Sequence, residues 1–268
     1  MTTPMIVCGA AGRMGRALVS LVLGTPSARL VGAVEVPNHP ALGQDAGTVA
    51  GAAPAGVMIT ADFAALAAAG AVVLDFTAAT AALEHLRIAV DRQTPIVIGA
   101  TGFTAAQQVE LSALAPRTRS VVAANMSVGI AVLQRLARAA AAALGDDFDP
   151  EIVELHHKLK IDAPSGTALA LARTVAEASG RTFPADAVFG REGLIGQRKR
   201  TEIGVLALRG GDVVGDHTVV FAGLGERLEL THRAQSRECL ARGAVRAALW
   251  LVEQPVGRYE MADVLGLP

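Results

Sequence analysis

The sequence is poor in features that mark several specialised classes of protein. Its two cysteines, Cys8 and Cys239, show neither the spacing of a metal site nor a CxxC motif, so we predict no bound metal and a reducing, cytoplasmic environment. Cys8 ends a short apolar run and is expected to pack in the core. The N-terminus lacks the pattern of a signal peptide, and no apolar stretch runs uninterrupted over the length of a membrane span, so no membrane partner is expected.

Charge is also scarce. Charged residues make up 18% of the chain, and the formal net charge of -1 gives no general attraction to nucleic acid or to an acidic membrane. The basic run at residues 198–200 is better explained as a solvated loop than as an RNA site. Apolar residues, by contrast, make up 51% of the 268 residues, which is enough for one large domain or two modest domains with buried cores.

The first half of the chain alternates short apolar segments with segments of helical periodicity. Continuous apolar strands between helices are typical of a parallel sheet covered on both faces, joined by right-handed crossovers. We therefore predict an α/β domain of the doubly wound, Rossmann-like type. The expected strands are residues 5–8, 30–34, 72–74, 96–98 and 121–124, and the expected helices are residues 13–23, 80–90 and 104–114.

The second half has a different pattern, and the change places a domain boundary near residue 126. Residues 201–233 are strand-like and repeatedly interrupted by glycine, which predicts hairpins of a mixed or antiparallel sheet. We interpret this half as a second, α+β domain with a mixed sheet. Its other expected elements are a helix at residues 128–144, a strand at 152–155, a helix from Gly166 and a helix at 239–251.

A glycine-rich loop joins the first expected strand to the first expected helix. Its GxxGxxG spacing, from Gly9 to Gly15, differs from the more usual GxGxxG, but Glu35 ends the second strand twenty residues after Gly15. Glycines let the backbone approach a ligand, the helix start offers N–H groups to a pyrophosphate, and the acid hydrogen-bonds the adenosine ribose. We predict a dinucleotide site, the alternative being a tight glycine turn with a surface glutamate.

Selection between NADH and NADPH depends on the residues near Glu35. A 2′-phosphate calls for a nearby cation, and Val36 and the two residues after it offer none. Arg13 is the obvious cation within the glycine loop. We therefore expect NADH to be favoured, with Arg13 as the route to use of NADPH.

A dense polar block, ELHHKLKIDAPSGT, occupies residues 154–167. Ser165 is a good N-cap, and Gly166 and Thr167 occupy the first turn of the helix that follows. Such a terminus binds carboxylates through backbone N–H groups, the threonine hydroxyl and the helix dipole, and Lys160 adds a full positive charge. The block therefore predicts a site for a small substrate with one or more carboxylates.

Histidine and lysine in this block can also supply a proton, which the reduction of a conjugated imine requires once hydride has reached carbon. A solvated loop with an ordinary helix cap is the alternative. Zinc is disfavoured because adjacent histidines chelate poorly without a further ligand at helical spacing.

The longer segment ELHHKLKIDAPSGTAL, residues 154–169, resembles the signature of the 4-hydroxy-tetrahydrodipicolinate reductase family, and GAAGRMGR at residues 9–16 resembles the same family. The similarity runs from the first strand to the last helix. The further matching segments are DFT at 75–77, GATG at 99–102, ANMS at 124–127, IG at 203–204, RGGD at 209–212, GDHT at 215–218 and GAVRAALW at 243–250.

The resemblance implies an oxidoreductase of lysine and diaminopimelate biosynthesis. The implied reaction is reduction of 4-hydroxy-tetrahydrodipicolinate to tetrahydrodipicolinate by NADH or NADPH, after loss of water, with His156 as proton donor or acceptor and Lys160 as proton donor. The implied substrate-binding positions are His157, Gly166 and Thr167, and we add Ser165 to this predicted set as the cap of the same helix. The implied cofactor contacts are Gly9, Ala10, Ala11, Gly12, Arg13, Met14, Glu35, Gly99, Ala100, Thr101, Ala123, Ala124, Asn125 and Met126.

The resemblance also implies a homotetramer assembled through the sheets of the second domain, and a last helix that returns to the first domain. We therefore expect a dinucleotide-binding domain of residues 1–126 with 235–268, and a substrate-binding and oligomerisation domain of residues 127–234. A related imine or amino-acid dehydrogenase, such as an aspartate dehydrogenase, is one alternative, and the polar block argues against it. A non-catalytic NAD-binding sensor is another, and the presence of His156 and Lys160 argues against that.

Overall fold

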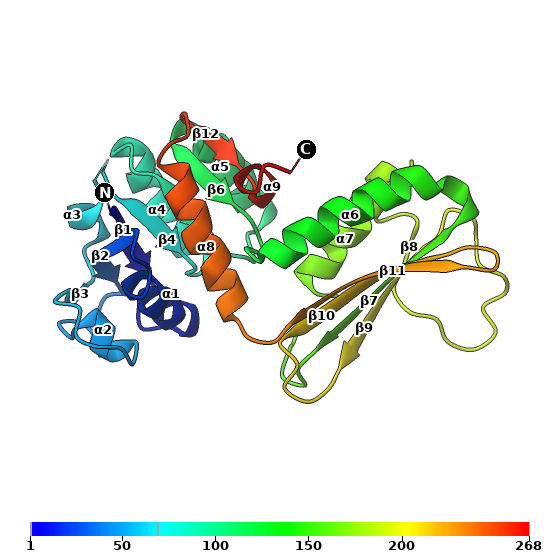
Figure 1. Cartoon of the computed structure of the whole chain (residues 1–268), viewed down its shortest axis with the longest axis horizontal. Coiled ribbons are helices and arrows are strands. Elements are labelled where there is room, and N and C mark those ends of the chain that lie inside the picture. Colours follow the sequence, from blue (N-terminus) through cyan, green and yellow to red (C-terminus); the bar gives the residue numbers. More distant parts are fainter. Residues whose placement is uncertain (1, 69, 268) are drawn as a thin grey trace. The chain divides into compact units, whose positions relative to one another are not determined.

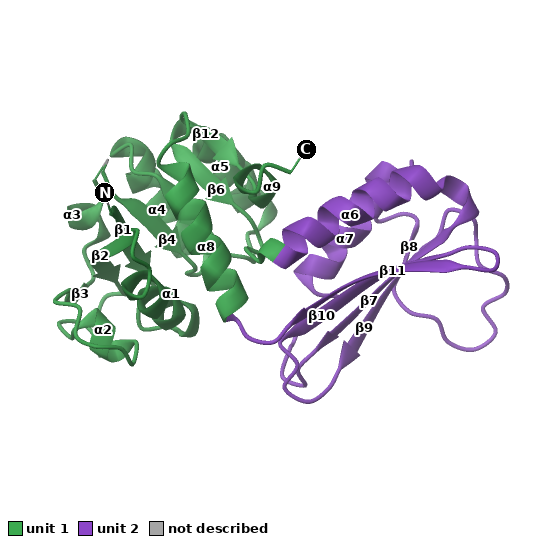
Figure 2. Cartoon of the chain, in the orientation of Figure 1, with its two compact units in different colours: residues 1–128, 238–268 green, residues 129–237 purple. Residues whose placement is uncertain are grey.

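A computed structural model describes residues 2–68 and 70–267 of the chain (Figure 1). The chain divides into two compact units (Figure 2). Unit 1 comprises Met1–Val128 and Glu238–Pro268, so the C-terminal segment belongs to the same unit as the N-terminal one, and unit 2 comprises Gly129–Arg237.

Unit 1 is built on a parallel sheet with the strand order β12-β6-β5-β4-β1-β2-β3. Successive strands are added on both sides of β1, so the sheet has a switch point between β1 and β4. Ligands of doubly wound folds bind at the carboxyl ends of strands beside such a point. The strands are β1 (Thr3–Cys8), β2 (Ala28–Val34), β3 (Ile59–Thr60), β4 (Val72–Asp75), β5 (Ile96–Ile98), β6 (Arg119–Val122) and β12 (Gly257–Tyr259).

Helices pack against both faces of this sheet, because its central strands are apolar on both sides. Every residue of β4 and β5 is buried. In the C-terminal helix α8, a side chain at Gly243 would lie 1.6 Å from the carbonyl oxygen of Met126, so glycine permits this close packing. The helices are α1 (Arg13–Leu23), α2 (Ala46–Val49), α3 (Phe63–Leu66), α4 (Ala79–Asp91), α5 (Ala105–Leu114), the 3-10 turn η1 (Ala115–Arg117), α8 (Glu238–Leu251) and α9 (Met261–Val264).

Unit 2 packs two helices on one face of a five-stranded mixed sheet of order β11-β10-β7-β9-β8 (Figure 2). Residues of β7 alternate between half-buried and buried, as expected for a strand with one face toward helices. Ile152, Val219 and Phe221 from the sheet pack with Leu133 and Val175 from the helices. The elements are α6 (Val128–Leu144), the 3-10 turn η2 (Gly145–Asp147), β7 (Asp149–His156), α7 (Gly166–Ala178), β8 (Ala187–Val188), β9 (Ile203–Arg209), β10 (Gly215–Ala222) and β11 (Arg227–Ala234).

The predicted fold class is confirmed, and so is the burial of Cys8 in the core. Two details were wrong. The strand expected at residues 121–124 ends at Val122. Within residues 201–233, all of which the structure describes, β10 and β11 form the one hairpin, because β9 pairs in parallel with β7, which lies between β9 and β10. A glycine-rich connection signals a change of direction locally, but it carries no information on which distant strand becomes the neighbour.

Among residues 2–68 and 70–267, one helix is long and apolar enough to cross a membrane by length and composition alone: the segment Val128–Asp147, with a mean hydropathy of 1.3. This is weak evidence for a span. Its apolar residues Ile130, Leu133, Ala137 and Ala141 are buried in the core of unit 2.

Candidate functional site

The glycine loop of unit 1 leaves the start of α1 open to a ligand. Gly9 has φ +70°, a conformation that favours glycine, and a side chain at Gly15 would lie 1.9 Å from the Gly9 carbonyl oxygen. Gly12 is the N-cap of α1, and within the described residues no side chain accepts a hydrogen bond from the helix start. The first-turn N–H groups and the helix dipole therefore form an anion site, into which a pyrophosphate fits.

Glu35 lies beside this loop. It follows β2, and its Oε1 accepts a hydrogen bond of 2.9 Å from the Ala11 N–H, while Oε2 lies 3.2 Å from the N–H of Val36. The carboxylate is thus held at the carboxyl end of the strand next to β1, where an acid can accept from ribose hydroxyls. Arg13, the first residue of α1, is exposed.

The other predicted cofactor residues lie at the carboxyl ends of neighbouring parallel strands. Residues 99–101 follow β5, and residues 123–126 follow β6. A side chain at Gly99 would come within 2.2 Å of the Phe76 ring, so glycine is needed there for packing as well. Met126 is fully buried, and its carbonyl oxygen faces Gly243 of α8, so in this structure it presents no surface to a ligand.

In unit 2, a buried carboxylate organises the predicted catalytic histidine. Glu154 and His156 lie two residues apart on β7 and therefore face the same side of the sheet. The Glu154 side chain is fully buried, and its Oε2 lies 2.5 Å from Nδ1 of His156. Its Oε1 accepts a 3.0 Å hydrogen bond from the Ser165 N–H, so one carboxylate joins His156 to the start of α7.

Arg209 neutralises this carboxylate. Its Nη1 and Nη2 lie 2.8 and 3.1 Å from the two carboxylate oxygens of Glu154. Burial alone would raise the pKa of Glu154, but the hydrogen bonds from Arg209, His156 and the Ser165 amide together hold that pKa below its usual value. Glu154 is therefore a carboxylate at neutral pH.

Lys160 lies in the segment between β7 and α7. Its Nζ is 2.7 and 2.9 Å from the carboxylate oxygens of Asp162, and this interaction lowers the pKa of Asp162. Arg209 also donates a 2.7 Å hydrogen bond to the Asp162 carbonyl oxygen. The same arginine thus fixes the Lys160 segment relative to Glu154.

Ser165 caps α7, as predicted, but its side chain is buried and occupied. Its hydroxyl accepts from the Ala168 N–H at 3.2 Å and lies 3.0 Å from Nε2 of His217. Burial lowers the pKa of His217 to about 4, with a smaller contribution from His156, so His217 is neutral. The tautomer of His217 sets which of Nε2 and the serine hydroxyl donates. In the same helix start, Gly166 is exposed and Thr167 is half-buried.

The absence of a side chain at Gly215 leaves room for the His156 ring. A side chain at Gly215, the first residue of β10, would lie 2.9 Å from Nε2 of His156. The second predicted histidine is His157, whose ring Nε2 lies 3.4 Å from an Nη2 atom of Arg237. The backbone N–H of His157 donates a hydrogen bond to the Val213 carbonyl oxygen. Unit 2 therefore brings together a fixed imidazole, an ammonium group and a helix N-terminus, which suits binding of carboxylates and delivery of a proton.

Three residues of this array had no role assigned from the sequence: Glu154, Arg209 and His217. The spacing of Glu154 and His156 along one strand was a usable signal, because alternate residues share a face. Arg209 and His217 lie in segments that resemble the family, but their contacts with the array had no signal in the sequence, since they reach it only through the pairing of β7 with both β9 and β10.

Comparison with known proteins gives a consistent result along the chain. The profile described as "Dihydrodipicolinate reductase, N-terminus" matches residues 3–126, and the profile described as "Dihydrodipicolinate reductase, C-terminus" matches residues 129–265. The 4-hydroxy-tetrahydrodipicolinate reductase of Anaeromyxobacter sp. (strain Fw109-5) is 53% identical over 264 residues, 98% of this chain and 97% of the relative. The protein of the same name from Syntrophus aciditrophicus (strain SB) is 48% identical over 261 residues, 97% of each chain.

Solved structures agree with the sequence relatives. A dipicolinate-bound dihydrodipicolinate reductase from Paenisporosarcina sp. TG-14 is similar with a TM-score of 0.76 and 25% identity, over 98% of this chain and 99% of that one. An amine dehydrogenase from Mycobacterium smegmatis, with a TM-score of 0.58, 15% identity and coverage of 97% and 95%, shares the fold alone.

Proposed function

The chain belongs to the dihydrodipicolinate reductase family, and from that premise we propose that it reduces 4-hydroxy-tetrahydrodipicolinate to tetrahydrodipicolinate in lysine and diaminopimelate biosynthesis. It is an oxidoreductase. The observation that carries the proposal is the array in which Glu154 joins His156 to the start of α7. Relatives near 50% identity carry the reductase name, so the aspartate dehydrogenase alternative is not favoured.

The start of α7 is the proposed site for the substrate carboxylates. Gly166 and Thr167 offer first-turn N–H groups and the positive end of the helix dipole, and Lys160 and His157 complete the proposed binding set. Because the Ser165 hydroxyl is engaged by His217 and Ala168, we assign Ser165 to shaping the terminus rather than to supplying its hydroxyl. The dicarboxylate bound in the solved relative from Paenisporosarcina supports a small dicarboxylate substrate.

Proton delivery is assigned to Lys160 and His156. The nicotinamide cofactor, when bound, supplies a hydride. Reduction of the conjugated imine at a ring carbon leaves electron density that a proton must neutralise. Lys160, held by Asp162, is the proposed donor, and His156 exchanges a proton through Nε2 while Glu154 fixes Nδ1.

The cofactor is proposed to bind the glycine loop of unit 1, with NADH favoured. Glu35 presents a carboxylate where the adenosine ribose is expected, and that charge repels a 2′-phosphate unless Arg13 compensates. We expect NADH to bind at least as tightly as NADPH in equilibrium titrations of both. A preference for NADPH above about tenfold, about 1.4 kcal/mol, would contradict this assignment.

A cytoplasmic homotetramer is also part of the proposal. The sheet face of unit 2 opposite α6 and α7 carries Val153, Leu155, Leu206 and Leu208, and Leu208 is 51% exposed. Exposed apolar surface on a sheet is typical of an interface between subunits. Sedimentation equilibrium on the purified protein would test the assembly, and a concentration-independent monomer would refute it.

The activity is tested by following NADH and NADPH oxidation with the freshly made aldol condensation product of pyruvate and aspartate semialdehyde. We expect oxidation that requires both precursors. The control replaces them with oxaloacetate and ammonia, the substrates expected of an aspartate dehydrogenase. Oxidation in the control reaction alone would overturn the proposed function.

A further inference from the structure

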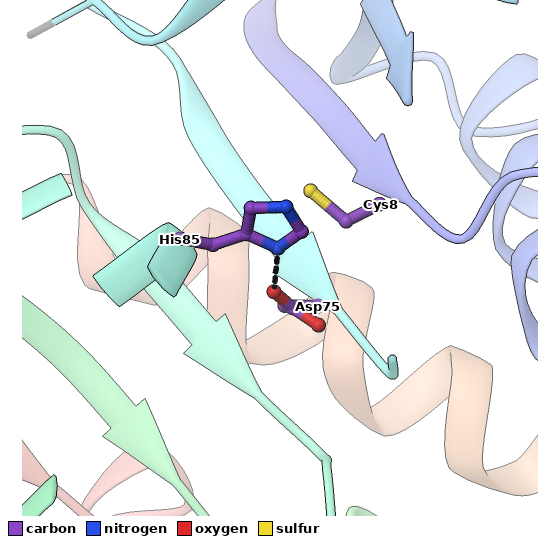
Figure 3. A group of neighbouring side chains, drawn as sticks. All are labelled: Cys8, Asp75 and His85. Atoms are coloured by element: carbon purple, nitrogen blue, oxygen red, sulfur yellow. Dashed lines mark hydrogen bonds and ion pairs between the residues drawn. The ribbon is translucent and has the colours of Figure 1, made fainter. Parts of the chain in front are cut away.

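A second group of chemically competent side chains lies beneath the glycine loop of unit 1. Cys8 is the last residue of β1, Asp75 is the last residue of β4, and the two are direct neighbours in the parallel pair. His85 comes from α4. The thiol and the carboxylate both point toward the imidazole ring (Figure 3), and one potential ligand atom from each residue lies within 4.8 Å of the other two.

The three side chains are enclosed and already oriented. Cys8 is 1% exposed and Asp75 is fully buried, whereas 15% of the His85 side chain reaches the surface. Asp75 Oδ2 lies 2.6 Å from His85 Nδ1, and its Oδ1 accepts from the N–H and hydroxyl of Thr77 at 2.9 and 2.6 Å. The Phe63 ring packs on the imidazole with centroids 4.5 Å apart. Little reorganisation is therefore needed before the three groups meet one ligand.

A cysteine, a histidine and an aspartate together could also form a nucleophilic triad. Burial, together with the negative charges of Asp75 and Glu35, raises the pKa of Cys8 well above its usual value, so the thiol stays neutral. A thiol that is 1% exposed also offers no approach to a substrate carbon. The arrangement therefore does not suit covalent catalysis.

We propose that Cys8, Asp75 and His85 form a binding site for a divalent cation of borderline softness, of which Zn²⁺ is the physiological representative. Thiolate, imidazole and carboxylate are the ligand types that zinc uses, and three protein ligands leave a fourth position for water. Binding of the cation displaces the proton of the Cys8 thiol, so that one thiolate and one carboxylate balance the charge of the cation, with His85 neutral. The loaded site is thus neutral overall, which limits the cost of burying its charges.

Occupancy of this site would affect the glycine loop directly. Cys8 precedes Gly9, and a side chain at Gly9 would lie 3.1 Å from the methyl group of Thr77, which Asp75 holds in place. A cation that draws Cys8 and Asp75 together therefore shifts both sides of the loop. We expect a bound cation to weaken cofactor binding, a consequence that rests on the proposed role of this loop.

The experiment uses Co²⁺ as a spectroscopic substitute for Zn²⁺, because a thiolate bound to Co²⁺ gives a charge-transfer absorption band. The chain has two cysteines, so in the variant Cys239→Ser the Cys8 thiol is the sole source of such a band. We expect the band in this variant and in the unmodified protein, its loss in Cys8→Ser, and its displacement by Zn²⁺. Asp75→Asn should weaken Co²⁺ binding by at least the about 10–100-fold that loss of a residue hydrogen-bonded to a metal ligand costs, because Asp75 is itself a proposed ligand.

The variant Cys239→Ser tests the proposed cation site even if Cys8→Ser fails to fold. Absence of the charge-transfer band in folded, reduced Cys239→Ser at millimolar Co²⁺ would overturn the site. Bands of Co²⁺ bound without sulfur would indicate a site that does not include Cys8 and would equally overturn it. Since absorption is measured without cofactor or substrate, this outcome is independent of the proposed reductase activity.

Discussion

Replacement of Glu154 by glutamine tests whether this residue positions His156. The carboxylate receives four donors: His156 Nδ1, the Ser165 N–H and the two Arg209 nitrogens. Glutamine has nearly the same shape, but its amide nitrogen cannot accept a hydrogen bond. If the amide oxygen stays with Ser165, the NH₂ group faces His156, which must then accept at Nδ1 and carry its proton on Nε2.

The expected losses differ for stability and for turnover. A hydrogen bond to a charged group contributes about 1.5–3 kcal/mol, and breaking a buried ion pair costs about 3–5 kcal/mol. Arg209 keeps its bonds to the Leu208 and Asp162 carbonyls and its side chain is 22% exposed, so we expect a loss of about 2–3 kcal/mol, below the cost of breaking a fully buried ion pair. Turnover should fall about 10²–10⁴-fold, the usual contribution of a positioned acid or base.

Urea unfolding measures the loss of stability, and kcat measures the loss of turnover. The nitrogen NMR shifts of His156 report the change of its tautomer. Glu177→Gln is the control, because it removes an exposed carboxylate of α7 that pairs with Arg138 at 2.8 Å and should cost at most about 1 kcal/mol. A purely structural role for Glu154 would lower stability and leave the His156 tautomer unchanged. Unaltered kcat with an unaltered tautomer would refute the positioning role.

Three further predictions concern the same array. Lys160→Ala should lower kcat about 10²–10⁴-fold, a larger effect than its rise in KM, and a rise in KM alone would leave Lys160 a binding residue without a role as acid. Gly215→Ala should place a methyl group 2.9 Å from Nε2 of His156, reducing kcat and costing about 1–3 kcal/mol in thermal unfolding, whereas wild-type kcat would show that the ring is free to move. Because the pKa of His217 is about 4 in the folded chain against an ordinary value of 6.5, the unfolded state binds more protons between these values, so stability should fall by up to about 3 kcal/mol as pH drops from 6.5 to 4. Urea unfolding across this window should show a shallower loss in His217→Gln, and an identical slope would contradict the assignment.

Local sequence signals were sufficient for the elements that carry the proposed site. Helix α1 begins after Gly12 and ends at Leu23, as the apolar periodicity and the following glycine indicated. The Ser165 cap of α7 was predicted from residue type and position, and the side chain does accept from the Ala168 N–H. These features depend on residues within one turn of each other, so the sequence alone specifies them.

Contacts that depend on strand order were not predictable in the same way. Arg209 meets Glu154 because β9 pairs in parallel with β7, and His217 reaches Ser165 because β10 pairs with the opposite edge of β7. Cys8 and Asp75 are 67 positions apart and become neighbours only through the pairing of β1 with β4. Spacing along the chain therefore gave no indication that Cys8, Asp75 and His85 could form a cation site.

Transfer of deuterium from cofactor to product tests the central claim most directly. The measurement uses NADH deuterated at the transferable position, the freshly made condensation product of pyruvate and aspartate semialdehyde, and mass spectrometry of the product. We predict tetrahydrodipicolinate that carries one deuterium on a ring carbon, formed in step with cofactor oxidation. Cofactor oxidation without deuterium in tetrahydrodipicolinate, or no reaction with either NADH or NADPH, would contradict the assignment of this chain as the reductase.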